Sequence, residues 1–490
     1  MVPSAPIDPF APIDLYAGLP PWVQVLFWLA FVGALWSFGS VIVLAFLAHR
    51  DRVRAANAAK AAHGAGLEHE FLWVFVVPAL NEEVTINDSV QRLRATTASN
   101  AIVLVVDDGS DDQTGAILDG IDDPRLEVLH RVAPNARNGK AGALNAAYDH
   151  LINEVLPRPE FRKWSANRVI VAVVDADGRL DADAPTAVSR RFADPEVGGV
   201  QTLVRIYNRR GWLTWAQDVE FGSFGLLFQS GRSWWGSANM GGNGQFNRLA
   251  ALVTVADDEG PWRHRLTEDQ DLGVRVLQAG WTAHQENTVE VQQQGLNSIR
   301  RLIRQRTRWA QGSWQALSLL PGSWRLRSVP LLGRIDAVGY LLSPAIQFVI
   351  GTAMVVSAIM WATGHTYRPN GWWILIVFVT IGFGPGVLTL AIRGGRPISV
   401  LTAIPLAIPY SIYSWIVFPV LGIGLVRQII GRHSWAKTAR ESIASSPIDV
   451  TTELAITRSG AQESVLRMRL NGIANDSDTP SRPARKISSS

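Results

Sequence analysis

FLWVFVVPALNEE, residues 71–83, is a run of apolar and β-branched residues that ends in a polar turn. This composition predicts a strand buried on both faces and stopped at Pro78, with a helix after the turn. Two later stretches repeat the pattern and end in carboxylates, AIVLVVDDGSDD at 101–112 and RVIVAVVDADG at 168–178. Strands that are apolar on both faces and alternate with helices are typical of a parallel, doubly wound sheet.

Four carboxylates follow these strands, at the edge where such a sheet binds its ligand. Asp107 and Asp108 follow the second strand, and Asp175 and Asp177 follow the third. The latter pair can place two carboxylates around one Mg²⁺ or Mn²⁺, because these hard cations prefer oxygen ligands. A solvated turn rich in Asp and Gly is the other interpretation of this pair.

Two further stretches suit an anionic ligand and a general base. RNGKAGALN at 137–145 is a Gly-rich loop leading into a helix, so its amides and Lys140 can meet a diphosphate, although it lacks P-loop spacing. TEDQDLG at 267–273 holds Glu268 and Asp269, and a carboxylate near a substrate hydroxyl is the simplest base. A turn with a solvated lysine and an ordinary helix N-terminus are the competing interpretations.

The composition indicates that part of the chain lies in lipid. Of 490 residues, 47% are hydrophobic and 18% charged, and the absence of Cys excludes disulfide scaffolds, thiolate metal sites and cysteine nucleophiles. The uncharged run 22–47 is long enough to cross a bilayer; a signal peptide is the rival interpretation, but no Lys or Arg precedes the run. Arg50, Arg52 and Arg54 follow it and predict a cytoplasmic middle region.

Apolar runs return between 338 and 426 and predict about three more membrane segments. One of them is expected to be re-entrant or part of a hairpin, because three full spans would leave the basic residues after 426 outside the cell. IRRLIRQRTRWAQ at 299–311 has apolar and Arg residues at helical spacing, which predicts an amphipathic helix at the membrane surface.

The motifs PALNEE, VVDDGSDD, GKAGALN, DAD, TEDQDL and QRTRW occur in this order before the late membrane segments. This series resembles the membrane-integrated family 2 glycosyltransferases, the group of cellulose, hyaluronan and poly-N-acetylglucosamine synthases, over about residues 70–440. The resemblance implies an α/β GT-A fold, a Rossmann-like mixed sheet, in a cytoplasmic domain with an α-helical transmembrane region. It also implies sugar transfer with inversion from a nucleotide donor, usually UDP-linked.

The resemblance assigns the donor side of the site to five residues. Asp108 matches the aspartate that contacts the nucleotide, with Asp107 beside it, and Lys140 matches the lysine that contacts the donor. Asp175 and Asp177 match the DxD pair, which implies binding of the diphosphate and of Mg²⁺ or Mn²⁺.

The catalytic and acceptor side is implied in the same way. Asp269 matches the base that deprotonates the acceptor hydroxyl, and Glu268 is the adjacent catalytic residue. Gln305, Arg308 and Trp309 match the Q-x-x-R-W element associated with processive members. There Trp309 would form the floor of the acceptor site and Arg308 would face the diphosphate.

The predicted segments are an extracytoplasmic tail (1–21), a span (22–47), a linker (48–70), the GT-A domain (71–295), interfacial helices with QRTRW (296–330), a membrane region (338–426) and a basic, then disordered cytoplasmic tail (427–490). We expect an integral protein of the plasma (inner) membrane.

The expected activity is extension of a β-linked polysaccharide. A lipid glycosyltransferase acting on diacylglycerol or polyprenyl phosphate is the alternative, because the membrane region is short. The partners implied are a nucleotide sugar, a polysaccharide or lipid acceptor, and membrane lipids. A partner subunit is compatible with this activity, and no nucleic acid is expected to bind. A non-enzymatic scaffold and a transporter are disfavoured, since every acid and arginine of the chemistry is present and the late spans lack acids.

Overall fold

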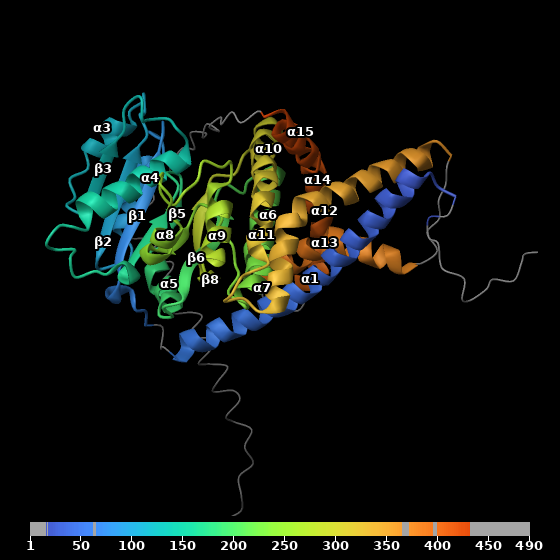
Figure 1. The fold of residues 1–490 in the computed structure, drawn as a ribbon, viewed down its shortest axis with the longest axis horizontal. Helices are drawn as coiled ribbons and strands as arrows, with labels where there is room; N and C mark the ends of the chain where they lie inside the picture. Colours follow the sequence, from blue (N-terminus) through green and yellow to red (C-terminus); the bar gives the residue numbers. More distant parts are fainter. Residues whose placement is uncertain (1–15, 17, 62–64, 365–371, 395–398, 432–490) are drawn as a thin grey trace, which may run out of the picture. The chain divides into compact units, whose positions relative to one another are not determined.

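The computed structural model describes residues 16, 18–61, 65–364, 372–394 and 399–431. The tail predicted at 427–490 and the one predicted at 1–21 therefore lie largely outside the described residues. A sheet domain with helices on both faces occupies the middle of the described chain, and long apolar helices come before and after it in sequence (Figure 1).

The sheet has eight strands in the order β3-β2-β1-β4-β7-β6-β8-β5. Figure 1 shows β3, β2 and β1 side by side at one end of it. The strands are β1 Leu72–Ala79, β2 Ala101–Asp107, β3 Leu126–His130, β4 Val169–Val173, β5 Arg179–Leu180, β6 Val197–Ile206, β7 Gln245–Arg248 and β8 Thr282–Gln293. The first four neighbours in this order are parallel, but β7 is antiparallel to both β4 and β6. The sheet is thus mixed, as the resemblance implied. The apolar strands alone predicted a wholly parallel sheet, and that prediction is wrong.

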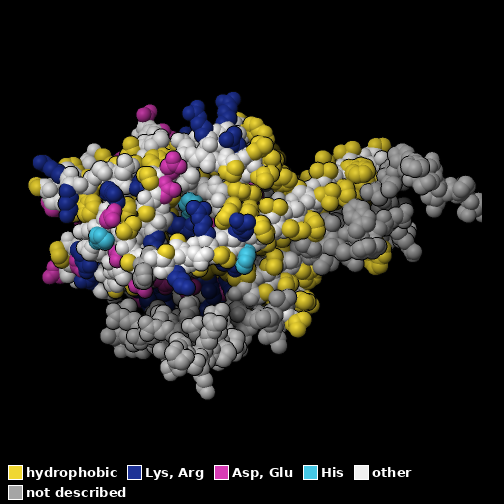
Figure 2. Space-filling view, turned by 90° about the horizontal axis from the view of Figure 1, so that it is seen from below, with side chains coloured by type: hydrophobic (Ala, Val, Ile, Leu, Met, Phe, Trp, Pro, Cys, Tyr) yellow, Lys and Arg dark blue, Asp and Glu magenta, His cyan; other side chains and the backbone are white. Residues whose placement is uncertain are grey.

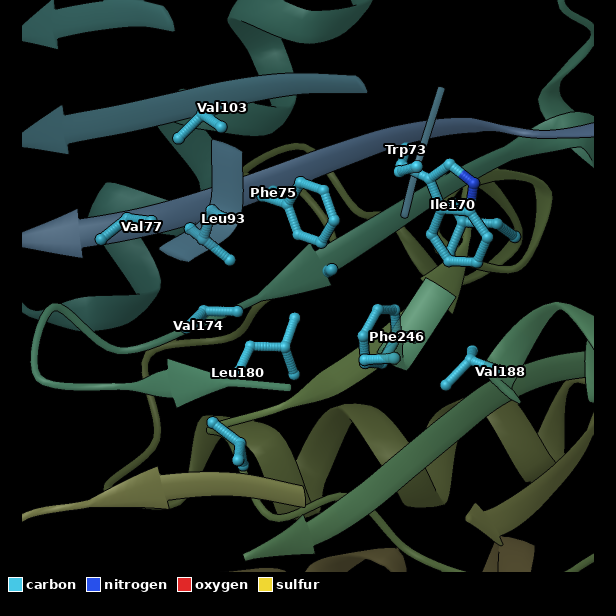
Figure 3. Close-up of a cluster of buried hydrophobic side chains, with 14 of the residues drawn as sticks. Trp73, Phe75, Val77, Leu93, Val103, Ile170, Val174, Leu180, Val188 and Phe246 are labelled. Atoms are coloured by element: carbon cyan, nitrogen blue, oxygen red, sulfur yellow. The ribbon is translucent and has the colours of Figure 1, made fainter. Parts of the chain in front are cut away.

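Both faces of β1 are buried, which explains its nearly continuous apolar sequence. Trp73, Phe75 and Val77 belong to a core cluster on one face, together with Phe246 of β7 (Figure 3). Val74 belongs to the cluster on the opposite face. The strand runs one residue past Pro78, to Ala79, before the polar turn begins.

Helices and other strands supply the rest of these two cores, and ten α-helices lie between residues 86 and 323. They are α2 Ile86–Arg94, α3 Thr114–Asp119, α4 Lys140–His150, α5 Ala184–Phe192, α6 Trp212–Gly222, α7 Ser230–Ser233, α8 Leu249–Val255, α9 Glu268–Gln278, α10 Ile299–Ala316 and α11 Leu320–Ser323. Residues of α2 and α5 join the cluster of Figure 3, while α4, α8 and α9 join the cluster on the other face. The N-terminal ends of α4 and α9 carry residues that the sequence marks as functional.

The apolar helices are α1 Pro21–Ala61, α12 Leu331–Ala362, α13 Trp372–Gly394, α14 Ser399–Val417 and α15 Pro419–Ile430. Among the described residues, three segments are long and apolar enough to cross a membrane: α1, α12 and the stretch Leu401–Ile430 that joins α14 to α15. Many of their large apolar side chains are exposed, including Trp22, Val32, Phe46, Ile359, Trp361, Leu401, Ile408 and Ile412. Figure 2 shows such side chains gathered apart from the charged surface of the sheet domain.

Helix α1 is longer than the predicted span and includes much of the predicted linker, since it continues to Ala61. Beyond the apolar run it contacts the sheet domain, because buried Asp51 forms an ion pair with Arg191 of α5 at 3.4 Å. Gly231 of α7 permits close contact, as a Cβ atom there would lie 2.6 Å from the carbonyl oxygen of Leu44. The segment after the first span is therefore a docked helix over 48–61.

Candidate active site

Lys140 is the first residue of α4, and its ammonium group lies among carboxylates from two other elements. Its Nζ donates to Oδ1 of Asp175 at 2.6 Å, just after β4, and lies 3.9 Å from Oε1 of Glu268 in α9. Three stretches that the sequence singled out separately thus meet at the carboxyl edge of the sheet.

Asp269 lies in the same cluster, in the first turn of α9. Gly242 covers it, because a Cβ atom at this glycine would lie 3.0 Å from Oδ2 of Asp269 and 3.5 Å from Nζ of Lys140. The φ angle of +80° at Gly242 is one that side chains rarely adopt, so glycine is needed here for both backbone angle and space. We call Lys140, Asp175, Glu268 and Asp269, with Arg308, the acid cluster.

Arg308 of α10 closes the acid cluster from the side of the interfacial helix. Its Nη1 donates to the carbonyl oxygen of Leu266 at 3.4 Å, and its positive charge lowers the pKa of both Glu268 and Asp269. The cluster thus contains two cations and three carboxylates, so the carboxylates outnumber the positive charges that can neutralise them.

Burial and charge set the protonation of this cluster. Burial, with the neighbouring Asp269, raises the pKa of Glu268 to about 7, against the effect of Lys140 and Arg308. Burial also raises the pKa of Asp269, with Lys140 opposing the rise. Burial lowers the pKa of Lys140, but the carboxylates of Asp175, Glu268 and Asp269 outweigh it and hold that pKa above its ordinary value. The acid pair therefore retains a proton close to neutral pH while Lys140 stays charged.

The raised pKa values predict an acid limb in the pH profile of kcat/KM, centred near pH 7. A base works only when deprotonated, so activity falls as the pH falls through the raised pKa. Glu268→Gln should move this limb to lower pH, because the like charge beside Asp269 is removed. Initial rates from pH 5 to 9 check this, and an unmoved limb in the variant contradicts it. The contribution of Glu268 to the free energy of unfolding changes in the opposite direction to activity. Because its pKa is higher in the folded state, the folded state binds a proton that the unfolded state has already lost. Glu268 therefore stabilises the fold less as the pH rises from 4.5 to about 7.

Asp107 and Asp108, at the end of β2, form a second group with residues that follow β3. Oδ2 of Asp107 lies 3.0 Å from Nδ1 of His130, and Arg131 donates to Asp108. Burial raises the pKa of Asp108 in spite of Arg131. Neither His130 nor Arg131 was predicted from the sequence, because the short strand LEVLH before Arg131 is only half-buried and has a weak pattern.

The two groups lie on either side of the first turns of α4. A Cβ atom at Gly142, two residues after Lys140, would lie 3.7 Å from Nη2 of Arg131. An open pocket of about 210 Å³ lies here, lined by Arg131, Asn138, Gly142, Asn145, Ala146, Asp149, Glu259 and His264. This polar pocket adjoins the aspartate that the resemblance assigns to the nucleotide.

Asp177 points to different partners from Asp175. Its Oδ2 accepts the N–H of Gln294 at 3.1 Å, whereas the N–H of Asp175 donates to Oδ1 of Asn243 at 3.1 Å. Asn243, in the stretch MGGNGQF, fixes the turn that holds Asp175, and the glycines around it were the only sequence signal for it.

No three His, Cys or acidic side chains gather into a preformed metal site in the part of the chain that the structure describes. The side chains of Asp175 and Asp177 offer only oxygen atoms, and these would suit Mg²⁺ or Mn²⁺. Such a cation would complete its coordination with phosphate oxygens and water, as Mg²⁺ commonly does.

Gln305 and Trp309 lie on α10 but contact a different set of residues from Arg308. Oε1 of Gln305 accepts from Nη1 of Arg306 at 2.8 Å. The guanidinium of Arg306 lies 4.1 Å from the ring centroid of Trp309, and Phe221 packs edge-on against the same ring at 6.1 Å. The QRTRW element is therefore divided between the acid cluster and an aromatic group beside it.

Comparison with known proteins finds a family match for the sheet domain. Residues 73–312, which contain every predicted site residue, match the family described as glycosyltransferase like family 2. The β-monoglucosyldiacylglycerol synthase of Synechocystis sp. is 30% identical over 298 residues, 58% of this chain and 56% of that protein. The poly-β-1,6-N-acetyl-D-glucosamine synthase of Staphylococcus aureus is 26% identical over 250 residues, 50% of this chain and 55% of that protein. The chain thus spans a little over half the length of these curated relatives.

A solved structure supports the fold. The mannosyltransferase PcManGT of Pyrobaculum calidifontis, in complex with GDP-Man and Mn²⁺, aligns with 83% of this chain and 100% of its own at a TM-score of 0.50 and 17% identity. With the family match, this likeness confirms the GT-A type of mixed sheet that the resemblance implied. Residues 73–312 therefore form a glycosyltransferase domain of family 2, which this chain joins to helices long and apolar enough to span a membrane.

Proposed function

We propose that this protein is an inverting, membrane-bound glycosyltransferase that moves a sugar from a UDP-linked donor to a lipid hydroxyl at the cytoplasmic face of the inner membrane. The observation that carries the proposal is the acid cluster, in which Lys140 lies 2.6 Å from Asp175 while Asp269 and Glu268 lie beside it. Inversion needs a base and a stabilised leaving group on opposite faces of the sugar, and this cluster offers both kinds of residue.

The roles follow from charge and position. Asp269 takes the proton of the attacking hydroxyl, and Glu268 shares the negative charge of the pair. Lys140 and Arg308 neutralise the diphosphate as it departs, the largest electrostatic change of the reaction. Asp175 and Asp177 would hold a Mg²⁺ or Mn²⁺ ion, which supplies further positive charge to the leaving phosphates.

A membrane helix reaches the acid cluster, which favours an acceptor presented by the bilayer. Tyr340 of α12 interacts electrostatically with Asp269 and approaches the side chains of Gln270 and Asn239. A hydroxyl held at the head-group level can thus approach the base without leaving the membrane surface. The identity of 30% and 31% to two synthases named for monoglucosyldiacylglycerol supports a diacylglycerol acceptor.

Extension of a β-linked polysaccharide is the second candidate. The Q-x-x-R-W element at Gln305, Arg308 and Trp309 supports it, as does the 26% identity to a poly-N-acetylglucosamine synthase. In both candidates the exposed basic residues after the first apolar run, Arg50 and Arg54, favour a cytoplasmic active site by the positive-inside rule.

A partition assay separates the two acceptors. Membranes containing the full-length protein receive diacylglycerol, Mg²⁺ or Mn²⁺, and labelled UDP-glucose, UDP-N-acetylglucosamine or GDP-mannose. We expect label in the organic phase from one UDP-sugar, and none with Asp269→Asn. Label confined to an insoluble polymer would support the second candidate, and no transfer from any donor would contradict the proposal.

A further inference from the structure

Arg306 is a buried cation on α10, between the predicted acceptor residue Gln305 and Arg308. It forms an ion pair with Glu220 of α6, and its Nη2 also lies 3.3 Å from the hydroxyl of Tyr413 in α14. The Tyr413 hydroxyl donates to Oε2 of Glu220 at 2.6 Å, which closes a triangle of three polar side chains. We call Glu220, Arg306 and Tyr413 the polar triangle.

The polar triangle connects three elements that are far apart in sequence. Glu220 and Arg306 are 86 residues apart, and Tyr413 is 193 residues from Glu220. Helix α14 belongs to the apolar stretch Leu401–Ile430, whereas α6 belongs to the sheet domain. The triangle therefore joins a membrane helix to the interfacial helix that carries the Q-x-x-R-W element.

Stability is a poor explanation for this arrangement. A guanidinium and a carboxylate removed from water lose hydration free energy that their pairing only partly restores. In the described part of the chain, Nε of Arg306 is buried with no hydrogen-bond partner, which adds to the cost. Apolar side chains of similar volume would fill this space at a lower cost in free energy, so the geometry that the triangle imposes explains it better than stability does.

That geometry is centred on Trp309. The guanidinium of Arg306 lies 4.1 Å from the Trp309 ring centroid, and residues three apart on a helix share a face. Phe221, which follows Glu220 on α6, meets the same ring edge-on with an interplanar angle of 78°. The Trp309 indole thus contacts the Arg306 guanidinium and the ring of Phe221. Arg306 belongs to the polar triangle, and Phe221 directly follows its member Glu220 in sequence.

We infer that the polar triangle positions Trp309 for the acceptor, so that α14 is a working part of the acceptor site through Tyr413. The inference rests on the proposed function, in which Lys140 and Arg308 act on the donor diphosphate, and on the acceptor role that the family resemblance gives to Trp309. Lys140 is bonded to Asp175, and the triangle is bonded to Gln305, so the two sets of contacts are distinct. Disturbing the triangle should therefore affect acceptor binding and spare the donor.

Tyr413→Phe is the sharpest test, because it removes one hydroxyl from the triangle and leaves the ring. Tyr410→Phe is the matched control, since Tyr410 stacks on Tyr413 at 6.2 Å in the same helix. Full-length protein in phospholipid nanodiscs is assayed with diacylglycerol as acceptor. The apparent KM for diacylglycerol, the KM for the UDP-sugar, and UDP release without acceptor are each measured, and insoluble product is scored in parallel.

We expect Tyr413→Phe to raise the acceptor KM about fivefold, because one hydrogen bond to Glu220 is lost. Glu220→Gln should raise it about tenfold, because the negative charge that pairs with Arg306 is lost as well. The donor KM and UDP release should stay within about twofold of wild type. Arg306→Lys, which keeps the charge but loses the planar fork, should fall between wild type and Glu220→Gln.

Several outcomes would overturn the inference. If the acceptor and donor KM values change together, or if only the melting temperature falls, the triangle is structural. If Tyr410→Phe has the same effect as Tyr413→Phe, the hydroxyl of Tyr413 has no special part. If wild-type protein forms neither lipid nor polymer product, the proposed function fails and the inference with it.

Discussion

Replacing Asp269 with Asn should lower kcat for sugar transfer by about 10²-fold or more, the usual contribution of a general base. The amide has nearly the same shape as the carboxylate but cannot accept the proton of the attacking hydroxyl. The 2.6 Å contact between Lys140 and Asp175 does not involve Asp269, so donor binding should remain within about threefold of wild type. Initial rates at saturating donor, together with UDP titration calorimetry, measure the two effects separately.

Asp122→Asn is the matched control, because Asp122 is an exposed carboxylate of the same domain. It should behave as wild type in both measurements. Near-normal turnover in Asp269→Asn would refute the assignment of the base and would turn attention to Glu268, the other carboxylate of the pair.

Replacing Lys140 with Met should reduce kcat/KM for the donor by about 10²-fold, because the departing diphosphate loses a fixed, desolvated cation. The same change leaves Asp175, Glu268 and Asp269 without their nearest positive charge. Since Lys140 lowers the pKa of both Glu268 and Asp269, its removal should also move the acid limb of the pH profile to higher pH. A pH series of initial rates records both effects.

Lys163→Met serves as the control for Lys140→Met, since the Lys163 side chain is exposed. Lys140→Arg should recover part of the lost donor affinity, because it restores the charge with a different shape. An unchanged donor KM in Lys140→Met, or an acid limb that stays in place, would contradict the role given to this lysine.

The sequence predicted the parts of the fold that local pattern encodes. β1, β2 and β4 are apolar runs ended by polar turns, and each was found where the pattern placed it. β7 was not found, because it has only four residues and includes Asn247 and Arg248. Its antiparallel pairing with β4 joins residues more than 70 positions apart, and this pairing makes the sheet mixed.

The same limit applies to the site. Lys140, Asp175 and Asp269 each belong to a recognisable stretch, so each was predicted, but their meeting depends on the packing of α4, β4 and α9. Arg131 and Tyr413 were missed for a physical reason: their importance lies in a partner on another element, Asp108 or Glu220, and nothing in their own neighbourhood indicates it.

Helix α1 has a consequence for how this sequence can vary. One unbroken helix carries the lipid-facing residues at one end and Asp51, bonded to Arg191, near the other. Each residue in a helix turns the chain by about 100° and advances it 1.5 Å, so a single insertion between Leu47 and Asp51 would turn the two ends out of register. Related sequences can therefore exchange the exposed apolar residues of this helix freely, but its length across that short interval should not change.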